Sequence, residues 1–208
     1  KLTFTNYLRL LRNIFLAVAM GLATVMLLSR NVAETKNLRA LQYVTRTGKH
    51  ILYYKIAALL LTSFSAALVM LALLFINGTR YGFTEFPGGY INNSLNQSAA
   101  IVPIQMNFST YILMSFVCMF LMTFFICLLS LVFDSFIRNG SLRFFMLIPM
   151  GALSYWLITF MTDYYPEDPH ETLVNLSLPL CEIMIPLILC GIALAAVMFL
   201  QKKQVKDI

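Results

Sequence analysis

Five long apolar runs, separated by shorter polar stretches, divide this chain of 208 residues. A helix needs about 20 mainly apolar residues to cross the hydrocarbon layer of a membrane. The pattern therefore predicts an all-α integral membrane protein. Because no repeat or linker interrupts the pattern, we expect one transmembrane domain over residues 1–208. Its five transmembrane helices are expected over residues 14–29, 56–76, 108–133, 144–162 and 178–200.

The composition supports lipid as the solvent of these runs. Hydrophobic residues make up 60% of the chain and charged residues only 12%, whereas soluble domains hold about 45–50% apolar and about 25% charged residues. The formal net charge is +6, but most Lys and Arg residues lie in short stretches between the apolar runs. We therefore expect membrane lipids, and no nucleic acid, as the surroundings of this basic chain.

Positive residues mark every second connection, which predicts the orientation of the chain. The outer loops expected at 77–107 and 163–177 hold one basic residue, Arg80, between them. By the positive-inside rule, the basic connections and the C-terminus lie in the cytoplasm. The basic residues of these connections and of the C-terminal tail are Arg30, Lys36, Arg39, Arg46, Lys49, Lys55, Arg138, Arg143, Lys202, Lys203 and Lys206.

The N-terminal stretch does not fit this orientation. Five spans and a cytoplasmic C-terminus place residues 1–13 outside, although they contain Lys1, Arg9 and Arg12. One interpretation is a further span upstream of Lys1, which would give the intact protein six spans; this is the one we expect. The other is a basic amphipathic helix lying on the membrane surface.

The most informative polar stretch follows the first apolar run. A short helix over residues 34–46 would be amphipathic, with apolar and basic residues on opposite sides. Such a helix can dock in a groove of a soluble partner and transmit movement to the neighbouring spans. It can equally rest on anionic lipid headgroups. The apolar side would hold Leu38, Leu41 and Val44, and the basic side Lys36 and Arg39.

This stretch resembles the first coupling-helix region of type-2 ABC exporter permeases, the transmembrane subunits of ATP-binding-cassette transporters. The resemblance rests on an acidic residue soon after a span, a leucine-rich turn, the run Thr-Arg-Thr-Gly-Lys-His and the sequence Lys-Ile-Ala-Ala, from Lys55, opening the next span. It covers residues 29–61 directly, and the rest of the chain matches only in the spacing of runs and loops. Members of this family usually have six spans, which agrees with a span upstream of Lys1.

The resemblance implies a permease that couples ATP hydrolysis by separate cytosolic ATPase subunits to the export of an amphipathic, peptide, lipid or drug-like substrate. Two such subunits, identical or different, would face each other in a bacterial plasma membrane. The chain itself would not be an enzyme and would hold no cofactor, because ATP and Mg²⁺ would bind to the partner. The residues that the resemblance places against the ATPase are Glu34, Leu38, Leu41, Arg46 and Lys49.

Two alternatives remain open. Mechanotransmission-type ABC permeases also have an acidic residue followed by a run like Leu38-Arg39-Ala40-Leu41, although they usually have four spans and a large outer domain. A stand-alone membrane protein or intramembrane enzyme would need polar catalytic groups within its spans. The two histidines, His50 and His170, fall in loops on opposite sides of the membrane, which argues against an enzyme.

Few residues of the apolar runs are candidates for a site. Gly48-Lys49 is followed by His50, so the chain lacks the G-x-x-x-x-G-K-[ST] loop that binds phosphates. The four cysteines form no Cys-x-x-Cys pair, and we expect no metal site. The remaining candidates can be explained without a function, by ordinary helix packing or by hydration at the level of the lipid headgroups. These candidates for a substrate path or subunit contact are Glu182, Phe116, Phe120 and Phe124.

Overall fold

The computed structural model describes residues 4–29, 51–80, 107–136, 145–163 and 178–206. Five helices lie within these residues, one in each predicted apolar run, which confirms the all-α prediction. Three of them contain stretches long and apolar enough to cross a membrane: Tyr53–Asn77, Ser109–Phe133 and Ile183–Leu200. The helices are α1 (Phe4–Ser29), α3 (Ile51–Arg80), α5 (Phe108–Phe136), α7 (Leu147–Asp163) and α9 (Leu178–Lys206).

Two helices begin earlier than the apolar runs predict. Helix α1 begins at Phe4 instead of Ile14, because its packed face continues toward the N-terminus through the buried side chain of Leu11. Residues 4–13 are therefore the first turns of α1 and not a separate helix on the membrane surface. Helix α3 begins at Ile51 instead of Ile56, so Lys55 lies within its second turn.

Prolines lie in the first turn of α7 and inside α9. Helix α7 begins at Leu147, three residues later than expected, which places Pro149 in its first turn. Proline is tolerated there because the first-turn N–H groups have no partner within the helix. Pro186 lies inside α9 and has no N–H to donate to the carbonyl four residues before it, that of Glu182.

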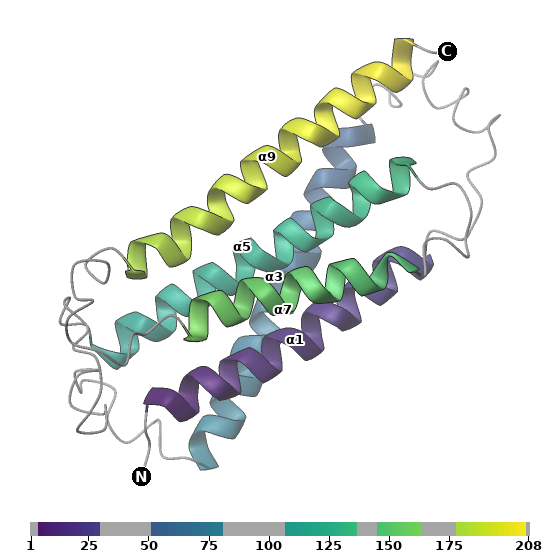
Figure 1. Ribbon diagram of the computed structural model, residues 1–208. Coiled ribbons are helices and arrows are strands. Elements are labelled where there is room, and N and C mark those ends of the chain that lie inside the picture. The colour runs from purple at the N-terminus through teal and green to yellow at the C-terminus, as the bar shows by residue number, and fades with distance from the viewer. Residues whose placement is uncertain (1–3, 30–50, 81–106, 137–144, 164–177, 207–208) are drawn as a thin grey trace.

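Successive helices run in alternating directions (Figure 1). Ser29, Ile51, Phe136, Leu147 and Lys206 therefore lie at one end of the bundle, which we call the C-terminal end. The opposite helix ends lie together at the N-terminal end of the bundle. This arrangement agrees with the alternation that the basic and acidic connections predict.

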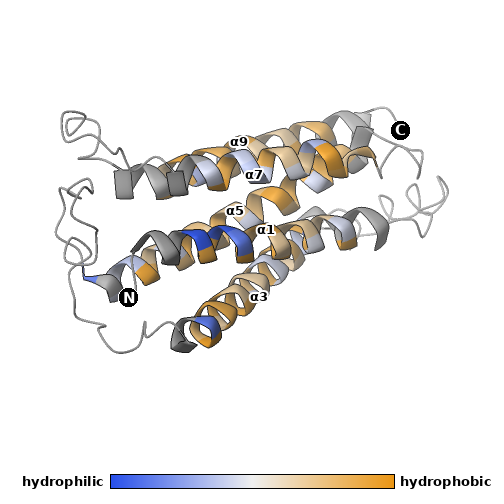
Figure 2. Cartoon of the chain, turned by 60° about the horizontal axis from the view of Figure 1, so that its bottom comes forward, coloured by the Kyte–Doolittle hydropathy of each residue, from blue (hydrophilic) through white to orange (hydrophobic). Residues whose placement is uncertain are grey.

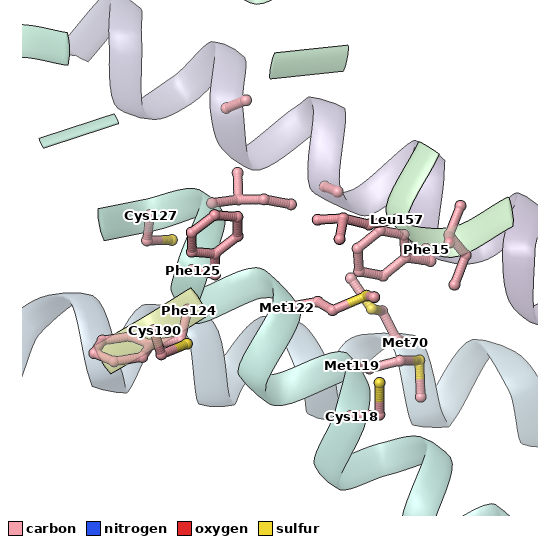
Figure 3. Packing of buried hydrophobic residues seen from close by; sticks show 14 of the residues in the cluster. Phe15, Met70, Cys118, Met119, Met122, Phe124, Phe125, Cys127, Leu157 and Cys190 are labelled. Atoms are coloured by element: carbon pink, nitrogen blue, oxygen red, sulfur yellow. The ribbon is translucent and has the colours of Figure 1, made fainter. Parts of the chain in front are cut away.

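Helix α5 is the centre of the bundle. It packs against α9, α3 and α1, while α1 also packs against α7 and α3. The apolar stretch of α5 is 56% buried within the molecule, whereas the apolar stretch of α9 is only 22% buried. The largest fully buried side chains belong to α1, α3, α5 and α7, and several of them are drawn in Figure 3. They include Phe15, Met70, Met119, Met122 and Leu157.

Figure 2 shows a hydrophilic stretch near the start of α1, while most of the coloured helix residues in this view are apolar. The sequence there contains Arg9, Arg12 and Asn13. Most hydroxyl groups within the helices are satisfied locally, since they donate hydrogen bonds to carbonyls three or four residues earlier. Thr62, Ser63, Ser130 and Ser154 all do so at 2.7–2.9 Å.

Candidate functional site

The predicted site residues divide into a described and an undescribed group. The coupling helix, with Glu34, Leu38, Leu41, Arg46 and Lys49, lies outside the described residues, as do most of the two predicted outer loops. The backbone of Glu182 lies in α9, as its fifth residue and close to the N-terminal end of the bundle. The three phenylalanines of α5 are described with their side chains, and they form the candidate site developed below.

Phe116, Phe120 and Phe124 lie at four-residue spacing, which puts them on one side of α5. The rings of Phe120 and Phe124 are stacked, with centroids 6.3 Å apart and an interplanar angle of 8°. Phe64 of α3 meets this series edge-on, 6.2 Å from Phe116 and 6.0 Å from Phe120. We call these four residues the aromatic row.

The aromatic row passes from the interior of the protein to its surface. Phe124 is only 6% exposed, whereas Phe64 is 46% exposed. Phe116 and Phe120 are half-buried between these extremes. A row of this kind offers a continuous apolar and aromatic surface that begins at the exposed side of α3 and ends in the core.

The row lies where α5 changes from partly exposed to enclosed. Leu113 and Val117 are exposed, while every residue from Met122 to Leu128 is buried. Figure 1 shows the reason: α9 runs along α5, but α3 crosses it, so α3 and α9 separate toward the end that holds Phe108. The more exposed half of α5 therefore lies toward the N-terminal end of the bundle, which is the predicted outer side.

Two hydrogen bonds link α5 to its neighbours close to the aromatic row. Cys190 of α9 donates from its thiol to the carbonyl of Leu121, at 3.2 Å. Thr123 Oγ1 lies 3.5 Å from the carbonyl oxygen of Ser63 on α3, and is also 2.8 Å from the carbonyl oxygen of Met119 in its own helix. These weak links leave shape and apolar contact as the main determinants of packing between the helices.

The described residues offer apolar binding and no hydrolytic chemistry. Within them, no group of three or more His, Cys, Asp or Glu side chains is placed to hold a metal ion. An aromatic row without acids or bases suits the apolar part of a ligand, through stacking and burial of apolar surface. The aromatic row can therefore accommodate a hydrophobic group.

Phe64 is the member of the row that sequence reasoning missed. The sequence feature that could have indicated it is a single aromatic residue among small ones, in the stretch Thr-Ser-Phe-Ser-Ala-Ala from Thr62 to Ala67. Small neighbours let α3 approach α5 closely, because Ser63 and Ala67 are fully buried while the larger Phe64 projects beside them.

Comparisons of the chain with protein-family models, with curated proteins and with solved structures found no match. The resemblance to exporter permeases therefore stays a prediction from the sequence of residues 29–61.

Proposed function

We propose that the chain is the membrane-spanning subunit of an ATP-driven exporter, with the energy supplied by a separate cytosolic ATPase. The observation that carries the proposal is the likeness of residues 29–61 to a coupling-helix region. The helix arrangement supports it, because the ends of α1 and α3 that flank residues 30–50 lie at the same end of the bundle as the C-terminal end of α9. The ATPase would bind at this end, through Glu34, Leu38, Leu41, Arg46 and Lys49.

The orientation supports the same arrangement. Lys202, Lys203 and Lys206 lie in the last turns of α9, at the end from which the basic residues 30–50 extend. The positive-inside rule then puts this end in the cytoplasm, where an ATPase has ATP. The protein would thus be a multi-pass protein of the cell membrane with a cytoplasmic C-terminus.

The exposed apolar faces support a second permease subunit, identical or different. Helix α9 has a single packing partner in this chain, α5, among the helix pairs in extensive contact. Export would proceed as two facing subunits alternate between inward- and outward-facing packing. An amphipathic, lipid-like, peptide or drug-like cargo suits the aromatic row, whose members carry no charge and reach the lipid-facing surface at Phe64.

The test is the combined substitution Glu34→Ala and Leu38→Ala in the tagged chain, purified from its native membranes. The unaltered chain should retain an ATP-binding-cassette ATPase with measurable ATP hydrolysis. The double variant should reach the membrane in equal amount and lose at least 90% of that bound ATPase activity, on the order of the effect of removing an interface anchor. A matched control in the same stretch, Asn37→Ala with Gln42→Ala, should retain it.

Other outcomes separate the alternatives. Absence of an ATPase from the unaltered complex, or its full retention in the double variant, would contradict the proposal. An ATPase that hydrolyses ATP in the complex without movement of any amphipathic probe across reconstituted vesicles would favour a mechanotransmission-type permease.

A further inference from the structure

Four sulfur-containing side chains lie together where α1, α3 and α5 meet. They are Met70 of α3 with Cys118, Met119 and Met122 of α5, and each is 3% exposed or less. Figure 3 shows the sulfur ends of Met70 and Met122 beside one another, with those of Cys118 and Met119 nearby and the ring of Phe15 from α1 next to Met122. We call these four residues the sulfur cluster.

The register of α3 and α5 explains why these side chains converge. The helices are antiparallel, with Phe64 beside Phe116 and Phe120 and with Ser63 beside Thr123. Long side chains in helices lean toward the N-terminus of their own helix. Met70 therefore leans back toward the level of Phe64, while the side chains of α5 lean the opposite way, and the thioethers reach one level.

One buried hydroxyl group on the same side of α5 has no partner. Ser115, Cys118, Met119 and Met122 follow the spacing i, i+3, i+4 and i+7, which is one side of a helix. The Ser115 hydroxyl is buried without a hydrogen-bond partner among the described residues. Among the described residues, the Thr159 hydroxyl on α7 is also buried without a partner. The buried hydroxyl groups of Ser63, Thr123, Ser130 and Ser154 donate to carbonyls of their own helix.

An unpaired buried hydroxyl is unfavourable, and a further polar group beside Ser115 would remove that cost. A thiolate at Cys118 would be such a group. Residues at i and i+3 are neighbours on a helix, so the Ser115 hydroxyl can donate a hydrogen bond to a Cys118 thiolate. The lone thiolate would be costly in an apolar interior unless a cation accompanied it.

We propose that the sulfur cluster binds one soft monovalent metal ion, Cu(I) or Ag(I). Thiolate and thioether sulfur atoms are the ligands that Cu(I) prefers. The Cys118 sulfur would form a bond to the metal as its S–H bond breaks, and the proton would pass to water without any change in oxidation state. Met70, Met119 and Met122 supply neutral thioethers, so the complex has no net charge and suits its apolar surroundings.

The sequence predicts no metal site because the cysteines form no Cys-x-x-Cys pair. The sulfur cluster differs from that prediction because it combines one cysteine with three methionines, whose thioethers otherwise serve as flexible packing in a core. The proposal does not depend on the exporter function. Binding can therefore be measured whatever the chain transports.

The test uses Ag(I), which stays monovalent, with the whole chain purified in detergent under reducing conditions. Silver is titrated in the presence of thiosulfate as a soluble competitor, and the metal retained per chain is measured by mass spectrometry. We expect one tightly bound ion per chain, with sulfur as its only neighbours in X-ray absorption spectra. Complete loss of silver to the competitor would overturn the proposal.

Thioether variants separate a built site from simple reaction of silver with thiols. Met70→Leu combined with Met119→Leu conserves volume and leaves every cysteine in place. Its affinity for Ag(I) should fall more than about 100-fold, because even outer partners of a metal site contribute 10–100-fold. Cys118→Ser should have the same effect.

The controls are Cys190→Ser and Met150→Leu, which alter buried residues outside the sulfur cluster. Both should bind silver as the unaltered chain does. Equal loss in Cys190→Ser and Cys118→Ser would overturn the proposal, and so would unaltered binding by the double methionine variant. Elution volume and helical circular dichroism confirm that each variant is folded, and the leucine variants keep the test valid if Cys118→Ser does not fold.

Discussion

At the scale of single residues, Phe64 links α3 to two rings of α5. Edge-to-face pairs contribute about 0.5–1.5 kcal/mol each beyond the burial of their apolar area. Phe64→Ala removes both pairs and should lower the free energy of unfolding by about 1–2 kcal/mol. The measurement is reversible unfolding of the purified chain in mixed micelles, followed by circular dichroism.

Phe75 provides the matched control, because it lies on the same helix and is 49% exposed. Phe75→Ala should change the free energy of unfolding much less, since lipid or detergent can cover either side chain at that position. Phe64→Leu should fall between the two, as it keeps apolar contact without the ring geometry. Equal losses for Phe64→Ala and Phe75→Ala would show that the ring pairs contribute nothing specific.

The aromatic row also shows what single residues reveal in the sequence. Phe116, Phe120 and Phe124 could be predicted as a group, because four-residue spacing puts them on one side of any helix. Phe64 could not be joined to them, because its partners depend on the register between two helices. Ser63 and Ala67 set that register by close packing, and no local pattern states which helix they pack against.

At the scale of helices, the contact between α1 and α7 depends on Gly151. A Cβ atom at this position would lie 3.0 Å from Met20 Cε and 3.1 Å from Met20 Sδ. The end of a methionine side chain can move, so Gly151→Ala should change the free energy of unfolding by less than about 1 kcal/mol, the size of the gain in helix propensity. Gly151→Leu should destabilise by about 1–3 kcal/mol, as overpacking does.

Two further variants test whether Met20 is the cause. Met20→Ala combined with Gly151→Leu should recover most of the stability, because the space of one side chain replaces that of the other. Gly191→Leu on α9 should leave the stability of the single chain unchanged, since no atom lies within 4 Å of a Cβ there. A loss in the combined variant equal to that of Gly151→Leu would exclude Met20 as the contact.

Helices were predictable in number because each apolar run is long enough to require one in lipid, where every backbone group must be satisfied within the segment. The residues at which the helices begin and end depend on tertiary packing, so they were harder to predict from the sequence. The start of α1 at Phe4 follows burial of Leu11, which hydropathy alone does not reveal beside Arg9 and Arg12. The start of α7 follows Pro149, whose place in a first turn could have been predicted.

At the scale of the whole molecule, the charges of the two ends bear on the unexpected arginines of α1. Arg9 and Arg12 lie toward the N-terminal end of the bundle, where α7 ends at Asp163. The sequence that follows Asp163 contains Glu167, Asp168 and Glu171. If the predicted outer loop lies on that side, its acidic residues would lower the cost of placing two arginines there.

This orientation can be tested with single cysteines in a chain whose Cys118, Cys127, Cys181 and Cys190 are replaced by Ser. New cysteines at Thr79 and Asn107 lie at the N-terminal end of the bundle, and those at Ile51 and Gln204 lie at the C-terminal end. A membrane-impermeant maleimide added to intact cells should label the first pair and not the second, because positive connections stay in the cytoplasm.

Permeabilised cells provide the control, because all four positions should then react. Labelling of only Ile51 and Gln204 in intact cells would preserve the alternation of the helices but reverse the orientation, and the ATPase-binding end would then face away from ATP. Labelling of Thr79 without Asn107 would contradict the alternation itself. The exporter proposal requires both the alternation and the orientation, since the likeness of residues 29–61 to a coupling region has meaning only where an ATPase can reach them.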